Sequence, residues 1–279
     1  MKKVLLTTSA LTLLAGAAAA DVSVAGYSRI GISNTGSATT NYLRNQVTFS
    51  GSATSDGGLT FSAWTRTRNS AKGSKFASTS AFAGPQLSVS NGAVTLTVGN
   101  ATGAVGSTAG AAVWGCGSIM WGCADLAGAS SWATQSSTGA GTNIVRLNMA
   151  LGSASVAVSG GNGNDTEVAM SVPMGGGSVG IGYDQETNPN LHVGFSGSAG
   201  GMGVGVRASQ SDGKTGYMAN VTAPVGAGSV YVFAGKTVAG SNNYGLRYNQ
   251  SLGGSVAMQA GASSVGGTTT VGAGLNFSF

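Results

Sequence analysis

The chain ends Val271-Gly-Ala-Gly-Leu275-Asn-Phe277-Ser-Phe279, and this stretch decides the fold. Apolar side chains occupy its odd positions, whereas glycine, asparagine and serine occupy the even ones. Successive side chains of a β-strand point to opposite faces, so the alternation predicts a strand with one apolar and one polar face. A soluble protein seldom ends such a strand on an aromatic residue. The ending therefore points away from an ordinary soluble domain.

The same two-residue alternation runs back through the chain to Asp21. Clusters of Gly, Asn and Asp interrupt it at short intervals, as in Thr54–Gly58 and Asn91-Gly92, and such clusters mark hairpin turns. We count sixteen strands, of which the fourth covers Ser80–Ser90. The connections alternate between very short turns and longer polar segments, as in transmembrane barrels. The sequence therefore predicts an all-β fold, a 16-stranded antiparallel transmembrane β-barrel.

Residues 1–20 have the composition of an export signal. Lys2 and Lys3 precede a short apolar core, and small residues lead to an Ala-x-Ala site ending at Ala20. This segment is too short for a membrane-spanning helix, which needs about 20 apolar residues. We expect a signal peptide at 1–20 and a barrel domain at 21–279, located outside the cytoplasm.

Composition separates this barrel from its alternatives. The 49 glycines could indicate disorder, but 42% of the residues are hydrophobic and only 8% are charged. A soluble β-sandwich would also alternate. Charge is almost absent from the apolar face, however, and aromatic residues of that face lie near strand ends, as in the interfacial girdles of membrane barrels. These aromatic residues are Tyr183, Tyr244, Phe277 and Phe279. No basic run interleaved with aromatic residues suggests nucleic-acid binding.

On several predicted strands, arginines occupy positions of the polar face. If the apolar face contacts outer-membrane lipid, then Arg29, Arg44, Arg66 and Arg68 line the lumen on three neighbouring strands. Clustered arginines create a positive potential, and rings of Arg or Lys select anions in pores. Arg146, Arg207 and Arg247 share this parity. The alternative is a solvated polar face with incidental charges, which is the better account for some of the last three.

One long interruption, residues 101–141, separates the fifth and sixth strands. A structureless run of this length inside a domain usually has a function. It contains Trp114, Trp121, Trp132, Cys116, Cys123 and Asp125. We expect it to fold into the lumen and narrow the pore. Cys116 and Cys123 form either a disulfide in an oxidising compartment or a pair of reduced thiols. Zinc would need more ligands, and no metal or other cofactor is implied.

Several short motifs resemble the general diffusion porins of alphaproteobacteria. These are the export signal, the first strand Asp21–Arg29, the segment Thr95–Asn100 before a long third loop, and the terminal Phe279. The resemblance covers the whole mature chain. It implies sixteen-stranded homotrimers in the outer membrane of a Gram-negative bacterium. In that family, acids of the third loop face a basic wall, and together they form the size-limiting constriction.

By this resemblance Arg29, Arg44, Arg66 and Arg68 match the basic wall, and Asp125 occupies the place of an acid. The family's loop usually has several acids, whereas this one has only Asp125. We therefore expect a passive pore for small hydrophilic solutes and ions, with a weak preference for anions. A solute-specific channel of the same fold is an alternative, as is a plugged barrel with a structural or adhesive role. An enzyme is not expected, because the sole histidine, His192, lies on a strand with no acid beside it.

Overall fold

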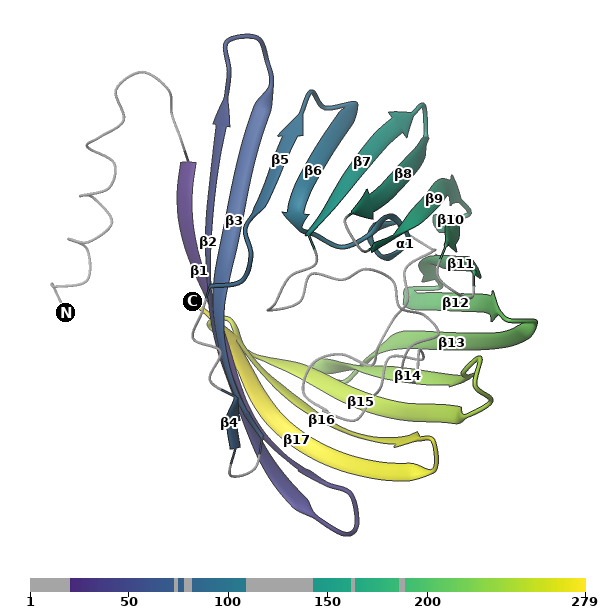
Figure 1. Cartoon of the computed structure of the whole chain (residues 1–279). Helices are drawn as coiled ribbons and strands as arrows, with labels where there is room; N and C mark the ends of the chain where they lie inside the picture. Colours follow the sequence, from purple (N-terminus) through teal and green to yellow (C-terminus); the bar gives the residue numbers. More distant parts are fainter. Residues whose placement is uncertain (1–20, 73–74, 78–81, 109–142, 162–163, 186–188) are drawn as a thin grey trace, which may run out of the picture.

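The computed structural model describes residues 21–72, 75–77, 82–108, 143–161, 164–185 and 189–279, drawn in colour in Figure 1. They form seventeen strands and one short helix, α1 (Ala104–Ser107). The strands are β1 (Asp21–Asn34), β2 (Thr39–Thr54), β3 (Thr60–Lys72), β4 (Lys75–Ala77), β5 (Gln86–Ser90), β6 (Val94–Asn100), β7 (Asn143–Leu151), β8 (Ala154–Gly161), β9 (Asn164–Met174), β10 (Gly177–Asp184), β11 (Asn190–Ala199), β12 (Met202–Ser211), β13 (Lys214–Val225), β14 (Gly228–Lys236), β15 (Asn242–Gly253), β16 (Val256–Val265) and β17 (Thr268–Ser278).

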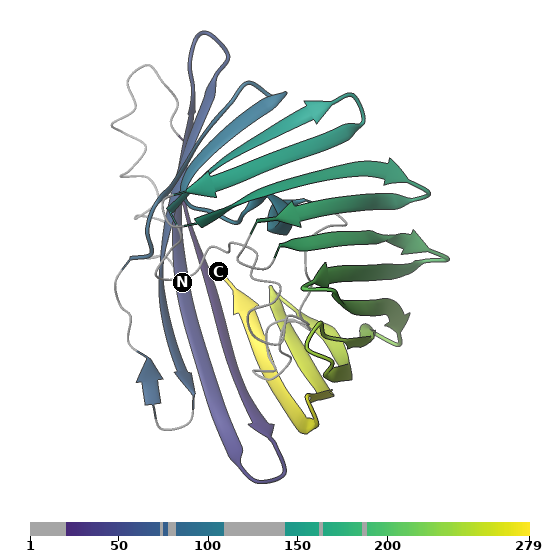
Figure 2. The same cartoon turned by 45° about the vertical axis from the view of Figure 1, so that its right-hand side comes forward.

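The strands form one closed antiparallel ring (Figures 1 and 2). Neighbouring wall strands follow one another along the chain, and β1 pairs with both β2 and β17, which closes the sheet. In the described part of the chain, β4 pairs only with the end of β3, so sixteen strands make up the wall. Closure removes the free edges that an open sheet would expose to lipid. The predicted 16-stranded barrel is confirmed.

The C-terminal stretch closes the ring. The amide of Gly26 on β1 donates to the carbonyl of Phe279 over 2.6 Å, and the amide of Phe279 donates back over 3.0 Å. The Phe279 ring lies where a side chain at Gly26 would be, so only glycine leaves room for it. The terminal aromatic residue and this glycine therefore form one packing unit at the seam.

The tight hairpins owe their shape to residues that accept positive φ. Two-residue connections fall at Gly175-Gly176, Gly200-Gly201, Asp212-Gly213 and Gly266-Gly267, and both residues of each pair have positive φ. This combination matches the right-handed twist of the flanking strands, and glycine and aspartate tolerate it best. Asn91-Gly92 makes another short turn, in which the Asn91 side-chain oxygen accepts from the amides of Ala93 and Val94.

The fourth wall strand is shorter than predicted. We expected Ser80–Ser90, but β5 begins at Gln86, and Phe82 makes only an isolated bridge with Thr67. Pro85 has no amide hydrogen to donate to a ladder. Its carbonyl instead accepts from the amide of Asn100 over 2.9 Å. Residues 78–81 lie outside the described part of the chain.

The two faces of the wall have opposite chemistry. Large apolar side chains point outward and remain exposed, for example Val22 at 62% and Leu246 at 51%. Buried side chains on the inner face are mostly Ser, Thr, Asn and charged residues, and a small apolar cluster lies under α1. This arrangement reverses that of a soluble protein and suits a barrel in lipid around a wet lumen. The described residues contain no helix that is long and apolar enough to cross a bilayer.

Candidate functional site: the lumenal wall

The four arginines predicted to line the lumen lie together on β1, β2 and β3. Arg29 and Arg44 are directly opposite each other in the β1–β2 ladder. Arg66 and Arg68 lie opposite Thr48 and Gln46 in the β2–β3 ladder. Arg44 is within electrostatic reach of the other three guanidinium groups. The structure thus brings all four into one cluster, which we call the basic wall.

Local contacts orient the basic wall. Arg68 Nε donates to the side-chain oxygen of Gln46 over 3.0 Å. The Arg66 guanidinium lies 5.4 Å from the ring centroid of Trp64 on the same strand, a cation–π distance. These contacts hold two flexible side chains against the wall. Arg29 is almost fully buried, at 4% exposure.

Two further arginines, on β12 and β15, lie beside aromatic residues of β14. The Arg247 guanidinium is 5.3 Å from the Tyr231 ring, and Tyr231 stacks on Phe233 with centroids 6.0 Å apart. Arg207 is buried and within electrostatic reach of Tyr231. The lumenal parity predicted for Arg207 and Arg247 is therefore confirmed. The cation–π contact shows that at least Arg247 is positioned by packing.

The described start of the long interruption lies inside the barrel. Helix α1 contacts the inner faces of β7, β8, β9 and β10, and Figure 1 shows it within the ring of strands. Ala104 and Val105 are fully buried against Ala157 and Ala169. A side chain at Gly182 would meet the Val105 side chain, so Gly182 provides the room for it. This docked segment, residues 101–108, is called the loop root below.

Polar groups of the wall fix the loop root. The amide of Ala104 donates to Ser159 Oγ over 2.8 Å, and the amide of Val105 donates to the Glu167 carboxylate over 2.8 Å. Arg146 donates to the carbonyl of Thr102. Glu167 is 1% exposed, so its charge is stabilised mainly by these neighbours. Ser159 and Glu167 were not among the site residues predicted from the sequence. One feature of the sequence could have pointed to Glu167, because an acid at a lumen-facing position of a strand is rare in this chain.

The surroundings of His192 differ from those predicted from the sequence. We expected no acid beside it, but Asp184 on the neighbouring strand lies 2.8 Å from His192 Nε2. Ser209 Oγ lies 2.7 Å from His192 Nδ1, and Asn190 donates to the other oxygen of Asp184. All four side chains are buried in the wall. The group therefore ties β10, β11 and β12 together through side-chain hydrogen bonds, a structural role.

The remaining predicted site residues lie outside the described part of the chain. They are Asp125 of the proposed constriction and the cysteines Cys116 and Cys123. The course of residues 109–142 and the state of both thiols stay predictions, as does the signal peptide at 1–20. Among the described residues, no group of three or more His, Cys, Asp or Glu side chains could hold a metal ion.

A closed barrel with an apolar exterior and a charged, polar lumen defines a membrane channel. A family model of Gram-negative porins matches residues 7–270. The chain therefore belongs to the Gram-negative porin family, which confirms the resemblance seen in the sequence.

Solved structures support the same fold. A triple mutant and a double mutant of the Rhodopseudomonas blastica porin, from an alphaproteobacterium, each match with a TM-score of 0.73 and 18% identity. Each match covers 93% of this chain and all of the other. No curated protein matches the chain. Family and fold together indicate an outer-membrane diffusion channel, and proteins of this kind are channels rather than enzymes.

Proposed function

We propose that the chain forms a passive pore for small hydrophilic solutes and ions, with a weak preference for anions. The basic wall carries this proposal. Four guanidinium groups on three adjacent strands produce a positive potential over one side of the lumen. Such a potential concentrates anions and repels cations, as basic rings do in selective pores.

The preference is weak because two buried acids lie in the lumenal side of the wall. Glu167 and Asp184 are directly opposite each other in the β9–β10 ladder and carry lumenal parity. Their oxygens accept hydrogen bonds from the loop root and Asn190, and Asp184 also contacts His192. These contacts hold both carboxylates in the wall, where their charge is opposite in sign to that of the basic wall. We further propose that residues 101–141 narrow the lumen, with Asp125 facing the basic wall. The docked loop root supports this proposal.

Recordings from a planar lipid bilayer test the function. We expect discrete current steps and, under a tenfold KCl gradient, a reversal potential on the chloride side of zero. A value at zero or on the potassium side would refute the anion preference, and an absence of steps would indicate a plugged barrel. Swelling of liposomes in a size series of sugars and amino acids then tests for solute specificity. A general pore discriminates by size alone.

We also propose that three copies assemble through the outer faces of β1, β2 and β3. Ser28, Asn45 and Asn69 form a polar row across this outward face, and Ser28 Oγ donates to Asn45 over 2.9 Å. Asn45 and Asn69 are exposed. A polar group that faces hydrocarbon without a full set of hydrogen-bond partners costs several kcal/mol. Contact with another copy of the chain would remove that cost. The trimer number comes from the resemblance to the porins.

Native mass spectrometry of the detergent-solubilised protein checks this assembly. The unmodified chain should appear as three copies, and Asn45→Trp should dissociate them by placing a bulky ring in the contact. Val221→Trp is the matched control, because Val221 is an exposed outward residue of β13. It should leave the trimer intact. Monomers from the unmodified chain, or an intact Asn45→Trp trimer, would contradict the proposed contact face.

A further inference from the structure

Trp64 on β3 faces the lumen next to the basic wall. It has the same parity as Arg66 and Arg68, whereas the outward positions of this strand hold residues such as Phe61, which is 47% exposed. The Arg66 guanidinium lies 5.4 Å from the centroid of the Trp64 ring, so both side chains are on the same face of the wall. Aromatic residues of the interfacial girdles point to lipid. Trp64 therefore does not belong to a girdle.

The space beside Trp64 is lined by polar side chains, most of them small. Ser50 is directly opposite Trp64 on β2, and Gln86 is directly opposite it on β5. Two residues nearer the start of β3, Ser62 is opposite a serine on each neighbouring strand. Trp64 is partly exposed and Ser62 is exposed. The indole ring is therefore accessible to a solute in the lumen.

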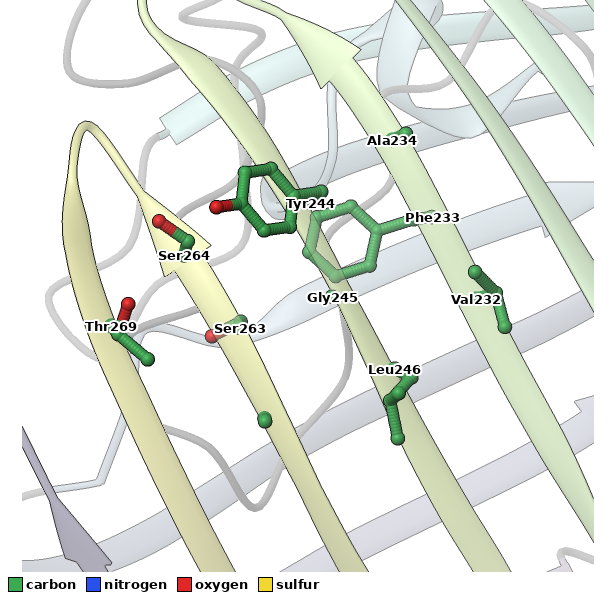
Figure 3. Close-up of a pocket in the computed structure, with 10 residues that line it drawn as sticks. Val232, Phe233, Ala234, Tyr244, Gly245, Leu246, Ser263, Ser264 and Thr269 are labelled. Atoms are coloured by element: carbon green, nitrogen blue, oxygen red, sulfur yellow. The ribbon is translucent and has the colours of Figure 1, made fainter.

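Another arginine–aromatic contact of the lumenal side is closed to solutes. Tyr231, whose ring contacts Arg247, is only 9% exposed, and the neighbouring Phe233 is 4% exposed. Figure 3 shows the Phe233 ring beside Gly245, where a side chain would collide with it. These two rings fill the wall, whereas the ring of Trp64 is presented to the lumen.

Trp64 lies between the basic wall and the periplasmic mouth of the pore. The long connection between β6 and β7 leaves the outer end of the barrel, because longer loops face the exterior. The antiparallel order then places the start of β3 at the periplasmic end. Trp64 precedes Arg66 and Arg68 on this strand. An anion that enters from the exterior and passes these two guanidinium groups therefore meets the indole next.

We propose that Trp64 and Arg66 form a subsite that favours planar aromatic anions over aliphatic anions of the same size. The anionic group of the solute pairs with the Arg66 guanidinium, and its ring lies against the indole. Guanidinium groups bind anionic oxygens through paired hydrogen bonds and also stack on aromatic rings. Offset-stacked rings have centroids about 4.5–7 Å apart. The 5.4 Å between the guanidinium and the indole falls in this range, so one small planar anion reaches both groups.

This subsite rests on the proposed anion-preferring pore and specifies which anions that pore retains longest. An aliphatic ring of the same size gains the contact with Arg66 but not the stacking on Trp64. Uncharged sugars gain no contact with a guanidinium charge, so they should still be sorted by size.

Block of the chloride current by two permanently charged anions tests the subsite. Benzenesulfonate and cyclohexanesulfonate have the same charge and nearly the same size, but only the first is planar and aromatic. In planar-bilayer recordings at low salt, the concentration that halves the chloride current should be about fivefold lower for benzenesulfonate, the scale of one aromatic pair. Trp64→Leu should make the two concentrations equal, because leucine is apolar but has no aromatic face. Trp64→Phe should keep most of the difference.

Tyr244→Leu is the matched control. Tyr244 is an exposed outward residue of β15 that lines a groove in the outer wall (Figure 3), so this variant removes an aromatic ring without changing the lumen. It should keep the difference between the two anions. Equal block by both anions in the unmodified pore would overturn the proposal, as would a difference that survives Trp64→Leu or disappears in Tyr244→Leu.

The reversal potential of the unmodified pore under a KCl gradient separates this proposal from the proposed function. If that potential lies on the chloride side while both sulfonates block equally, the anion preference stands and only the subsite is wrong. A potential on the potassium side would instead refute the anion preference on which the subsite rests.

Discussion

Arg44→Glu should convert the pore from weakly anion-preferring to cation-preferring. The substitution changes the local charge by two units within a cluster of like charges, because Arg44 is within electrostatic reach of Arg29, Arg66 and Arg68. Arg44 is only partly buried, so a charged glutamate remains solvated there. The reversal potential under a KCl gradient should therefore move from the chloride side to the potassium side.

The size of the effect follows from Coulomb's law. A unit charge about 6 Å from a passing ion contributes roughly 0.7 kcal/mol in water, which is about a threefold change in local ion concentration. Two units acting oppositely on cations and anions should change the permeability ratio by more than tenfold at low salt. At 1 M salt the screening length is only about 3 Å, so most of the shift should disappear.

The control for Arg44→Glu is the same change of charge on the other side of the wall. Lys236→Glu alters the net charge equally, but Lys236 points outward at the external end of β14. It should leave the reversal potential within error of the unmodified pore. If Lys236→Glu shifted selectivity as strongly as Arg44→Glu, net charge and not the basic wall would set the preference.

The architecture was predictable because a barrel wall has a strict period of two. Once Val22, Ile30 and the terminal strand fix which parity is apolar, each arginine on a strand is assigned to the lumen. Hairpins between consecutive strands then bring the basic wall together, since Arg29 and Arg44 are separated by a single short connection. Local alternation was therefore enough to predict both the barrel fold and the position of the basic wall.

The contacts between the loop root and the wall could not be predicted from this alternation. Glu167 contacts Val105, which is 62 residues away, and Ser159 contacts Ala104, 55 residues away. These contacts depend on where the chain re-enters the barrel after β6, and no sequence period encodes that point. The prediction that no acid lies beside His192 was wrong for a related reason. Its partner Asp184 lies on the neighbouring strand of the hairpin, but Gly182 and not Asp184 is directly opposite His192. Predicting the contact between His192 and Asp184 therefore requires the exact register of the two strands.

Gly103→Val should loosen the loop root and increase single-channel conductance. A β-carbon at Gly103 would collide with the carboxylate of Glu167, so the segment has to leave the wall or displace that group. Either movement weakens the hydrogen bond from the amide of Val105 to Glu167. A hydrogen bond to a charged group contributes about 1.5–3 kcal/mol, which is enough to change the docked population substantially.

The matched control for Gly103→Val is Gly160→Ala on β8. A β-carbon there would lie 3.7 Å from Thr166, an ordinary contact, so the conductance should not change. Glu167→Ala should reproduce the effect of Gly103→Val, because it removes the acceptor instead of crowding it. Two variants that act on the same contact by different means exclude a general loss of stability as the cause. Unchanged conductance in both, with the barrel folded, would show that the docked loop root does not control the width of the pore.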